Sequence, residues 1–275
     1  MKLSFYKYHG TGNDFILIDN REDLFKPQMQ VISRLCHRRF GIGADGLILL
    51  NKIEGYDFGM QYFNADGKES TMCGNGGRCV VAFADFLSLS AGPFRFLGID
   101  GGHTGVILSR HGTVCEVRLS MQPVKECKRS GKDYLLDTGS PHLVRFVEDT
   151  ESVDVVSEGR RIRNLPEFKP GGINVNFVMF DENELIVRTY ERGVEDETLS
   201  CGTGVTAAAI AYASLAGIHS GPVRVSARGG ILNVYFKKSS GGYSDIYLEG
   251  AAVSVFQGET DINTASFQDH LLSAE

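Results

Sequence analysis

The sequence predicts an α+β protein of two pseudo-symmetric domains, each a mixed strand barrel around a central helix. Residues 72–79 and 200–207 both contain a cysteine followed by Gly-x-Gly and then by a run of helix-forming residues. The two cysteines lie about half the chain apart, and strand-like runs precede and follow each copy. A repeat at this spacing indicates two related domains whose half-sites face each other across one cleft.

The first copy lies among short strand patterns. A helix is expected over residues 31–39, and residues 79–89 form an apolar run with a single charge, which is typical of a helix buried on nearly every side. Glycine-rich turns separate the strand patterns, as in a sheet that curls around this helix. The strands are expected at residues 5–9, 15–19, 47–50, 58–64, 94–99, 105–109 and 114–119.

The second half repeats this order after a passage between domains at residues 123–132. Its central helix is expected at residues 204–216, where small side chains permit close packing, and Gly217 is expected to end it as a C-cap. The tail from residue 259 to residue 275 has weak periodicity and is expected to be loosely held. Strands are expected at residues 134–147 (two strands around a Gly-Ser-Pro turn), 174–181, 185–191, 223–227, 231–236, 244–249 and 252–256.

Composition excludes several classes of function. The chain has 275 residues, a net charge of −6 and a pI near 5.7, so nucleic acid is not expected as the main partner. No apolar run reaches the roughly 18 to 20 residues of a membrane span, and residues 1–7 lack a signal-peptide core. We therefore expect a cytoplasmic protein with no membrane partner.

The six cysteines are too sparse for a disulfide framework, and a reducing compartment would keep them as thiols. None is spaced as CxxC, and Cys73 and Cys79 have no histidine nearby, so no metal site is expected. Cys36, Cys79, Cys115 and Cys127 are interpreted as small buried hydrophobes. Burial alone does not explain the duplicated glycine sequence around Cys73 and Cys201.

Each repeated cysteine is expected to lie where a helix begins. The first-turn N–H groups and the helix dipole both favour negative charge there, so the thiol pKa is expected to fall from about 8.5 toward neutrality. Such a group can take and give a proton, and the glycines let a small carboxylate approach the backbone. Each copy therefore predicts one acid/base group beside one anion-binding site. Glu69 and Glu197 are interpreted as favourable charges near the helix starts.

The main rival from pattern alone is a dinucleotide site, because residues 202–207 fit G-x-G-x-x-A. The βαβ unit and the acidic residue about 20 positions on are missing, since a turn is expected near Gly221. No Gly-Lys-Ser/Thr follows either glycine loop, which excludes a P-loop. No cofactor is expected.

Three signatures in this order resemble the diaminopimelate epimerases, a family of cofactor-independent amino-acid epimerases. They are residues 10–15 (Gly-Thr-Gly-Asn-Asp-Phe), residues 64–67 leading to 72–76, and residues 190–193 (Tyr-Glu-Arg-Gly) leading to 201–204. The resemblance runs from the first strand to about Gly258. It implies a first domain of residues 1–120 plus 250–275, carrying Cys73, and a second of residues 121–249, carrying Cys201, with the final strand returning to the first domain.

The resemblance implies inversion of one α-carbon of LL-2,6-diaminopimelate to give the meso isomer, on the route to lysine and peptidoglycan. Cys73 and Cys201 would flank that carbon, one removing a proton as thiolate and the other delivering one as thiol, without metal or pyridoxal phosphate. The developing charge on the substrate carboxylate would be stabilised by N–H groups. These donors are around Gly74, Asn75, Gly202 and Thr203.

The remaining site residues follow from the same resemblance. Arg192 suits a distal carboxylate through its planar fork, and His142 and Glu191 match positions that assist the cysteines and bind the reacting amino group. The positions that match substrate contacts are Asn13, Asn64, Asn174 and Arg192. Two positions depart from the common pattern: Ser140 stands where many members have Asn, and Gly46 where many have Gln.

Two alternatives stay open from the sequence. One is a proline racemase or hydroxyproline epimerase, although these usually have His in place of Asn75 and lack the tetrad of residues 190–193. The other is a thiol redox protein or sensor, because facing thiols can oxidise to a disulfide, which we expect to inactivate the protein reversibly. A small-molecule amino acid is the expected partner, and the resemblance alone suggests a homodimer.

Overall fold

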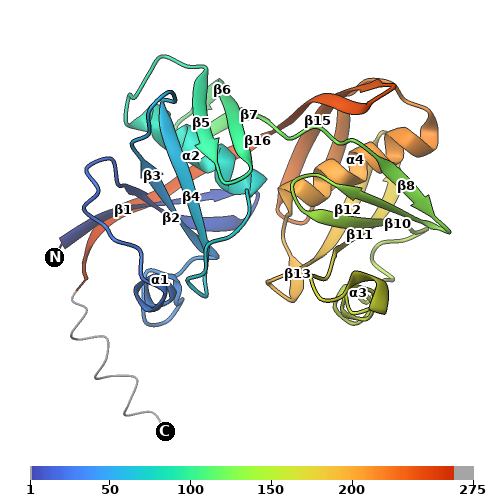
Figure 1. Cartoon of the computed structure of the whole chain (residues 1–275), viewed down its shortest axis with the longest axis horizontal. Helices are drawn as coiled ribbons and strands as arrows, with labels where there is room; N and C mark the ends of the chain where they lie inside the picture. Colours follow the sequence, from blue (N-terminus) through green and yellow to red (C-terminus); the bar gives the residue numbers. More distant parts are fainter. Residues whose placement is uncertain (1, 263–275) are drawn as a thin grey trace, which may run out of the picture.

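The computed structural model describes residues 2–262, which form two halves lying side by side (Figure 1). The strands of both halves belong to one hydrogen-bonded sheet. The long strand β16 (Gly242–Asp261) takes part in both halves and joins them. The fold is therefore the predicted α+β class, with a mixed barrel in the first half and a central helix in each half.

In the first half, eight strands close into a barrel, because β16 pairs with β1 at one side and with β7 at the other. Helix α2 (Gly74–Phe86) lies inside, and its residues are buried from Gly74 to Ala84. Helix α1 (Met29–Cys36) packs on the outside over a second, smaller core. The strands are β1 (Lys2–Gly10), β2 (Asn13–Asp19), β3 (Gly46–Asn51), β4 (Phe58–Asn64), β5 (Phe94–Gly98), β6 (Gly101–His111), β7 (Val114–Ser120) and β16.

The second half curls around helix α4 (Gly202–Ala216) in the same way. The sheet of this half is open between β8 (Cys127–Ser130) and β16. Val124, just before β8, bridges this opening by exchanging backbone hydrogen bonds of 2.9 and 2.7 Å with Tyr243 of β16. Gly217 ends α4 at φ 70°, as predicted for the C-cap. The strands in sheet order are β16, β15 (Gly230–Ser239), β14 (Val223–Ala227), β12 (Glu184–Glu191), β11 (Asn174–Asp181), β10 (Pro141–Phe146), β9 (Asp133–Asp137) and β8 (Cys127–Ser130), with β13 (Asp196–Thr198) beside β12.

The prediction of two separate strands on either side of Gly250 is wrong, because β16 runs through this residue without a break. Gly250 is needed for close packing: a Cβ there would lie 2.3 Å from a methyl carbon of Leu232. Beyond it, β16 pairs with β7 and then with β1 as far as Asp261, so residues 259–261 are held in the sheet. The rest of the tail, residues 263–275, lies outside the described residues. The division of the chain into domains at residues 120 and 250 stays a prediction.

Helix α3 (Val155–Arg163) and a short 3-10 helix (Pro166–Phe168) were not predicted. Within α3 only Val155, Gly159 and Ile162 are buried, too few for a clear apolar pattern. Its one local signal is Asp154, whose carboxylate caps the helix by accepting from the N–H of Ser157 at 3.0 Å. Both central helices begin directly after the cysteines, as predicted for the two thiols, and therefore extend to the N-terminal side of the runs expected at residues 79–89 and 204–216.

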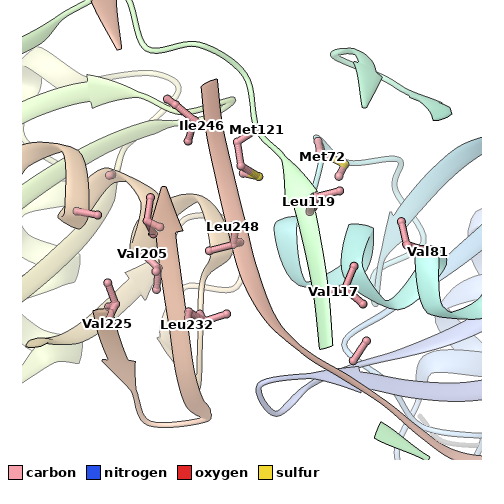
Figure 2. Packing of buried hydrophobic residues seen from close by; sticks show 14 of the residues in the cluster. Met72, Val81, Val117, Leu119, Met121, Val205, Val225, Leu232, Ile246 and Leu248 are labelled. Carbon is pink, nitrogen blue, oxygen red and sulfur yellow. The ribbon is translucent and has the colours of Figure 1, made fainter. Parts of the chain in front are cut away.

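The two helices share one core. The cluster of buried apolar side chains includes residues of both halves, and Leu248 of β16 lies between Val205 and Leu119 (Figure 2). The first turns of α2 and α4 approach closely, since a Cβ on Gly202 would lie 3.0 Å from Cα of Gly74 and 3.2 Å from N of Asn75. The cysteine-bearing ends of both helices therefore meet at one place.

Across residues 2–262, no helix combines the length and hydrophobicity that crossing a membrane requires. Nor does this part of the chain hold a group of three or more histidine, cysteine, aspartate or glutamate side chains arranged to bind a metal ion.

Candidate active site at the two helix starts

A cleft of about 360 Å³ opens where the two helices begin. Cys73 and Cys201 both line it, one from each half of the chain. Its volume lies within the range of pockets that hold small molecules, roughly 300 to 1,000 Å³. Of the predicted site residues, the following line the cleft: Asn13, Asn64, Cys73, Gly74, Asn75, Asn174, Glu191, Arg192, Cys201, Gly202 and Thr203; Ser140 does so as well. The cleft thus brings together all the predicted residues except His142.

The two cysteines occupy equivalent positions. Cys73 is the N-cap residue of α2 with φ −108° and ψ 118°, and Cys201 is the N-cap residue of α4 with φ −118° and ψ 111°. All six cysteines of the chain lie within the described residues and are free thiols. The first-turn N–H groups that follow each cysteine have no acceptor within their own helix, so they can donate to an anion in the cleft.

The predicted fall of both thiol pKa values toward neutrality is wrong. Burial raises the pKa of Cys73 to about 11, and it raises the pKa of Cys201 further. The N–H of Gly76, 3.5 Å from the Cys73 sulfur, favours the thiolate but does not outweigh desolvation. The carboxylate of Glu191 also raises both values. A cationic group in the cleft would act in the opposite direction and favour a thiolate.

The sulfur of Cys73 faces the side chain of Asn13. Oδ1 of Asn13 lies 3.6 Å from Sγ, and its Nδ2 donates to Oδ2 of Asp45 at 2.9 Å. Because a carboxylate only accepts, this bond fixes the orientation of the Asn13 amide. Asp45 is held in turn by Arg38, whose Nη2 lies 2.6 Å from Oδ1. The first thiol therefore faces a hydrogen-bond acceptor.

Asn75 connects the two halves beside the cleft. Its Nδ2 donates to the carbonyl oxygen of Ser200 at 2.9 Å, and its Oδ1 accepts from Nη2 of Arg78 at 2.9 Å. Arg78 is fully buried, four residues after Gly74 in α2. Asn75 thereby fixes the chain just before Cys201 against the helix that follows Cys73.

Glu191, the last residue of β12, and Arg192 directly after it also line the cleft. Burial raises the pKa of Glu191 to about 7, so this carboxyl group titrates near neutrality. The backbone N–H of Arg192 donates to Oδ1 of Asn174 at 2.8 Å, which orients the Asn174 amide. Nη1 of Arg192 lies 3.4 Å from the carbonyl oxygen of Gly171. A second cation, Arg163, lines the cleft here and was not predicted.

The glycine at position 46, where many diaminopimelate epimerases are expected to have Gln, has a steric explanation. A Cβ there would lie 2.5 Å from the ring of Tyr62 and 2.5 Å from the carbonyl oxygen of Phe63. Gly46 therefore contributes no side chain to the cleft, and Tyr62 lines it instead. Tyr62 was not among the predicted site residues, because the sequence shows it only as a member of a strand.

His142 is fully buried behind the wall of the cleft. Its Nε2 lies 3.0 Å from Oγ1 of Thr203 and 3.0 Å from Oγ of Ser140. Burial, and secondly the charge of Arg192, lower its pKa to about 3, so the imidazole is neutral at physiological pH. His142 thus contacts the site through Thr203 and Ser140, and through the amide Nδ2 of Asn174 at 3.5 Å from Nε2.

The family model described as diaminopimelate epimerase matches residues 5–118 and 134–255. A relative named diaminopimelate epimerase from Flavobacterium psychrophilum is 47% identical over 262 residues, covering 94% of this chain and 99% of the relative. One of the same name from Chlorobaculum tepidum is 43% identical over 259 residues, covering 90% and 98%.

Solved structures of low sequence identity share the fold. A phenazine biosynthesis protein of Bacillus anthracis has a TM-score of 0.76 at 15% identity, covering 95% of this chain and 100% of that one. A probable proline racemase of Agrobacterium radiobacter, solved with bound carbonate, has a TM-score of 0.70 at 16% identity, covering 95% and 93%. These likenesses show the fold alone.

Proposed function

The chain belongs to the diaminopimelate epimerase family, and we propose that it interconverts LL- and meso-2,6-diaminopimelate through its two cleft thiols. The observation that carries the chemistry is the position of Cys73 and Cys201, which are matched N-cap residues of two abutting helices and line one cleft. The reaction belongs to the biosynthesis of lysine and peptidoglycan precursors. The catalytic role of the thiols and the roles of the other site residues are our assignment.

The proposed reaction moves one proton on each face of an α-carbon. One cysteine, as thiolate, takes the α-proton and becomes a thiol, while the other gives its proton to the opposite face and becomes a thiolate. The roles exchange in the reverse direction, so no cofactor is needed. Negative charge that builds on the α-carboxylate is stabilised by the first-turn N–H groups of Gly74, Asn75, Gly202 and Thr203.

The raised thiol pKa values are compatible with this chemistry once substrate charge is considered. The α-ammonium group of a bound amino acid places a cation near the sulfurs, which favours a thiolate. We assign Glu191 to this ammonium group, because its carboxyl group lines the cleft and titrates near neutrality. His142 would act on Cys201 from behind the wall rather than on the substrate.

We assign Arg192, which lines the cleft, to the distal carboxylate of the substrate. Arg192→Met is expected to raise KM about 10- to 160-fold, which corresponds to the loss of one charge-assisted hydrogen bond of about 1.5 to 3 kcal/mol. Arg163→Met should raise KM less, because Nε of Arg163 already pairs with Oε1 of Glu195 at 2.8 Å. Steady-state kinetics with diaminopimelate would measure both effects. Equal effects of the two changes would contradict the assignment of Arg192 as the main carboxylate ligand.

The function is tested by incubating the purified protein with LL-diaminopimelate and separating the stereoisomers. We expect the meso isomer to form until the two interconvert at equal rates. Free L-proline and trans-4-hydroxy-L-proline, incubated alongside, should remain unchanged. Inversion of either of them without action on diaminopimelate would overturn the proposed substrate and favour a proline racemase-type enzyme.

We place the enzyme in the cytoplasm, because a pair of facing thiols works only where cysteines stay reduced. Oxidation by diamide is expected to join Cys73 to Cys201 and abolish activity, and dithiothreitol should restore it. Cys127→Ser, which leaves both cleft thiols in place, should be inactivated in the same way. A crosslinked protein with full activity would show that the thiols are not both needed.

The homodimer is likewise a proposal. Exposed apolar side chains on the first barrel support it, among them Leu108 of β6 and Val255 and Phe256 of β16. Light scattering coupled to size exclusion would give the mass in solution, and a value near the chain mass of 30.1 kDa would rule the dimer out.

A further inference from the structure

We infer that Asn176 is a positioning residue: it fixes the tautomer of His142 and so directs a chain of hydrogen bonds onto the sulfur of Cys201. No sequence pattern singled out this asparagine, which lies in the middle of β11. The inference rests on the proposed role of Cys201 as an acid/base group, and it adds the residues that tune this thiol from behind the wall of the cleft.

The orientation of the Asn176 amide is determined by its neighbours. Its Nδ2 lies 3.0 Å from the carbonyl oxygen of Leu143, which can only accept a hydrogen bond. Its Oδ1 accepts from the hydroxyl of Thr189 at 2.9 Å. The side chain is fully buried, and Gly204 makes room for it, since a Cβ there would lie 2.4 Å from Oδ1. The amide therefore cannot turn over without losing a buried bond.

This amide determines the protonation of His142. Nδ2 of Asn176 lies 3.1 Å from Nδ1 of the imidazole, and because Nδ2 can only donate, Nδ1 must be the unprotonated nitrogen. The ring is buried and neutral, so its single proton is on Nε2. Nε2–H then donates toward Oγ1 of Thr203 and Oγ of Ser140, each at 3.0 Å. The amide Nδ2 of Asn174 lies 3.5 Å from Nε2, but its two hydrogens go to the nearer carbonyl oxygen of Pro141 at 3.1 Å and Oγ of Ser140 at 3.2 Å.

The series of hydrogen bonds continues from His142 through Thr203. Its Oγ1 lies 3.4 Å from the sulfur of Cys201 and 3.3 Å from Oγ of Ser140. With Nε2 as a donor, the imidazole offers no lone pair that competes for the hydroxyl proton of Thr203. When Cys201 is ionised, this proton is therefore free to point at the thiolate. In the other tautomer, Nε2 would accept the same proton and draw it away from the sulfur.

The charged neighbours show why such a donor matters. Glu191 of β12 and Cys73 at the start of α2 both face Cys201, and both oppose a thiolate there. Arg192 faces His142 and disfavours an imidazolium. The Thr203 hydroxyl acts in the opposite direction and favours the thiolate. Cys73 has no equivalent, because its side-chain partner is the acceptor Oδ1 of Asn13.

Nitrogen-15 NMR of labelled histidines tests whether Asn176 fixes the tautomer of His142. The His142 signals are identified by their loss in His142→Asn. We expect a neutral ring protonated on Nε2 between about pH 6 and 8, where an ordinary histidine titrates. Asn176→Leu should lose this fixed tautomer. Thr189→Val is the matched control, because it removes a buried hydrogen bond from the same amide but should leave Nε2 protonated. An imidazolium, or a proton on Nδ1 in the unaltered protein, would overturn the inference.

The hydrogen bond from Thr203 to the sulfur of Cys201 is tested in a Cys73→Ala background. The rate of Cys201 alkylation by iodoacetamide is measured as a function of pH, and mass spectrometry confirms which cysteine has reacted. Thr203→Val is expected to raise the apparent pKa of Cys201 by about one unit, the size of one hydrogen bond to a charged group, and Thr203→Ser should restore it. Asn176→Leu should also raise it, and Thr189→Val should not. If Cys201 had the same apparent pKa in Thr203→Val and Thr203→Ser, the inferred hydrogen bond from Thr203 to the Cys201 sulfur would be wrong.

Neither measurement uses a substrate. If the histidine and thiol results fail while diaminopimelate is still inverted, the positioning role is wrong and the proposed function stands. If the histidine and thiol results are as expected but the protein does not invert diaminopimelate, the series of hydrogen bonds stands and the proposed substrate is wrong.

Discussion

Replacing either Cys73 or Cys201 by alanine is expected to lower kcat about 10³-fold or more, because each thiol contributes a proton transfer worth about 10²- to 10⁴-fold. In the proposed mechanism each variant loses one of two groups that no neighbour replaces, since the other cleft thiol would face the opposite side of the reacting carbon. The measurement is the initial rate of meso isomer formation from the LL substrate. KM should change far less than kcat, because the N–H groups and the arginines remain.

Cys127→Ala is the matched control, since this cysteine is only partly buried and lies outside the cleft. It should retain the kcat of the unaltered enzyme. Thermal unfolding of the three variants would separate a lost proton transfer from a damaged fold. If Cys73→Ala or Cys201→Ala kept more than about a tenth of the kcat, the corresponding thiol would not be an acid/base group of this reaction.

Gly204→Ala is expected to lower kcat about 100-fold, the typical effect of moving reacting groups by about 1 Å. The new methyl group would lie 2.4 Å from Oδ1 of Asn176 and 3.4 Å from the sulfur of Cys201. Either the amide or the first turn of α4 must shift, and the thiol and the N–H donors of Gly202 and Thr203 belong to that turn. Overpacking of this kind costs about 1 to 3 kcal/mol, partly offset by the better helix propensity of alanine.

Two further variants show whether the fall in kcat comes from this contact. Gly59→Ala, in β4, adds a methyl group whose nearest neighbour is 3.5 Å away, so kcat should not change. Combining Gly204→Ala with Asn176→Ala makes room for the methyl group, so the double variant should melt no lower than Asn176→Ala alone, although both lack the hydrogen bonds from Asn176 to His142 and Leu143. An unchanged kcat in Gly204→Ala would mean that the position of this helix start does not limit the reaction.

The sequence predicted the two central helices and the meeting of both cysteines at one cleft, because these follow from a repeated local motif. A cysteine followed by Gly-x-Gly and small residues defines a helix start wherever it occurs. The strand positions followed from short apolar runs between glycine turns. What could not be read locally was the joining of strands: Gly250 resembles a break, but it is a close-packed position within β16.

The electrostatics of the site could not be predicted from the motif. The helix start lowers a thiol pKa, but burial raises it, and burial depends on the whole fold. The placement of His142 behind the wall, and of Arg163 at the cleft, also depends on tertiary packing. Arg163 lies on a helix with too few apolar residues to be recognised from the sequence.

Asn176 carried a signal that could have been used. It lies between Val175 and Phe177 in a run of buried residues, and a buried asparagine requires hydrogen-bond partners. Two polar side chains, Asn174 and Asn176, alternate with apolar ones in this strand and point to a polar network on one face of the sheet. The partners themselves, His142 of β10 and Thr189 of β12, become visible only from the strand pairing.

The most direct test of the central claim follows the reacting hydrogen. LL-diaminopimelate is incubated with the enzyme in deuterated water, and product and remaining substrate are examined at low conversion by mass spectrometry and NMR. Two thiols on opposite faces predict one deuterium at the inverted carbon of the meso product and none in the recovered LL substrate. A product that keeps the original hydrogen, or deuterium entering substrate and product equally fast, would contradict the two-thiol account.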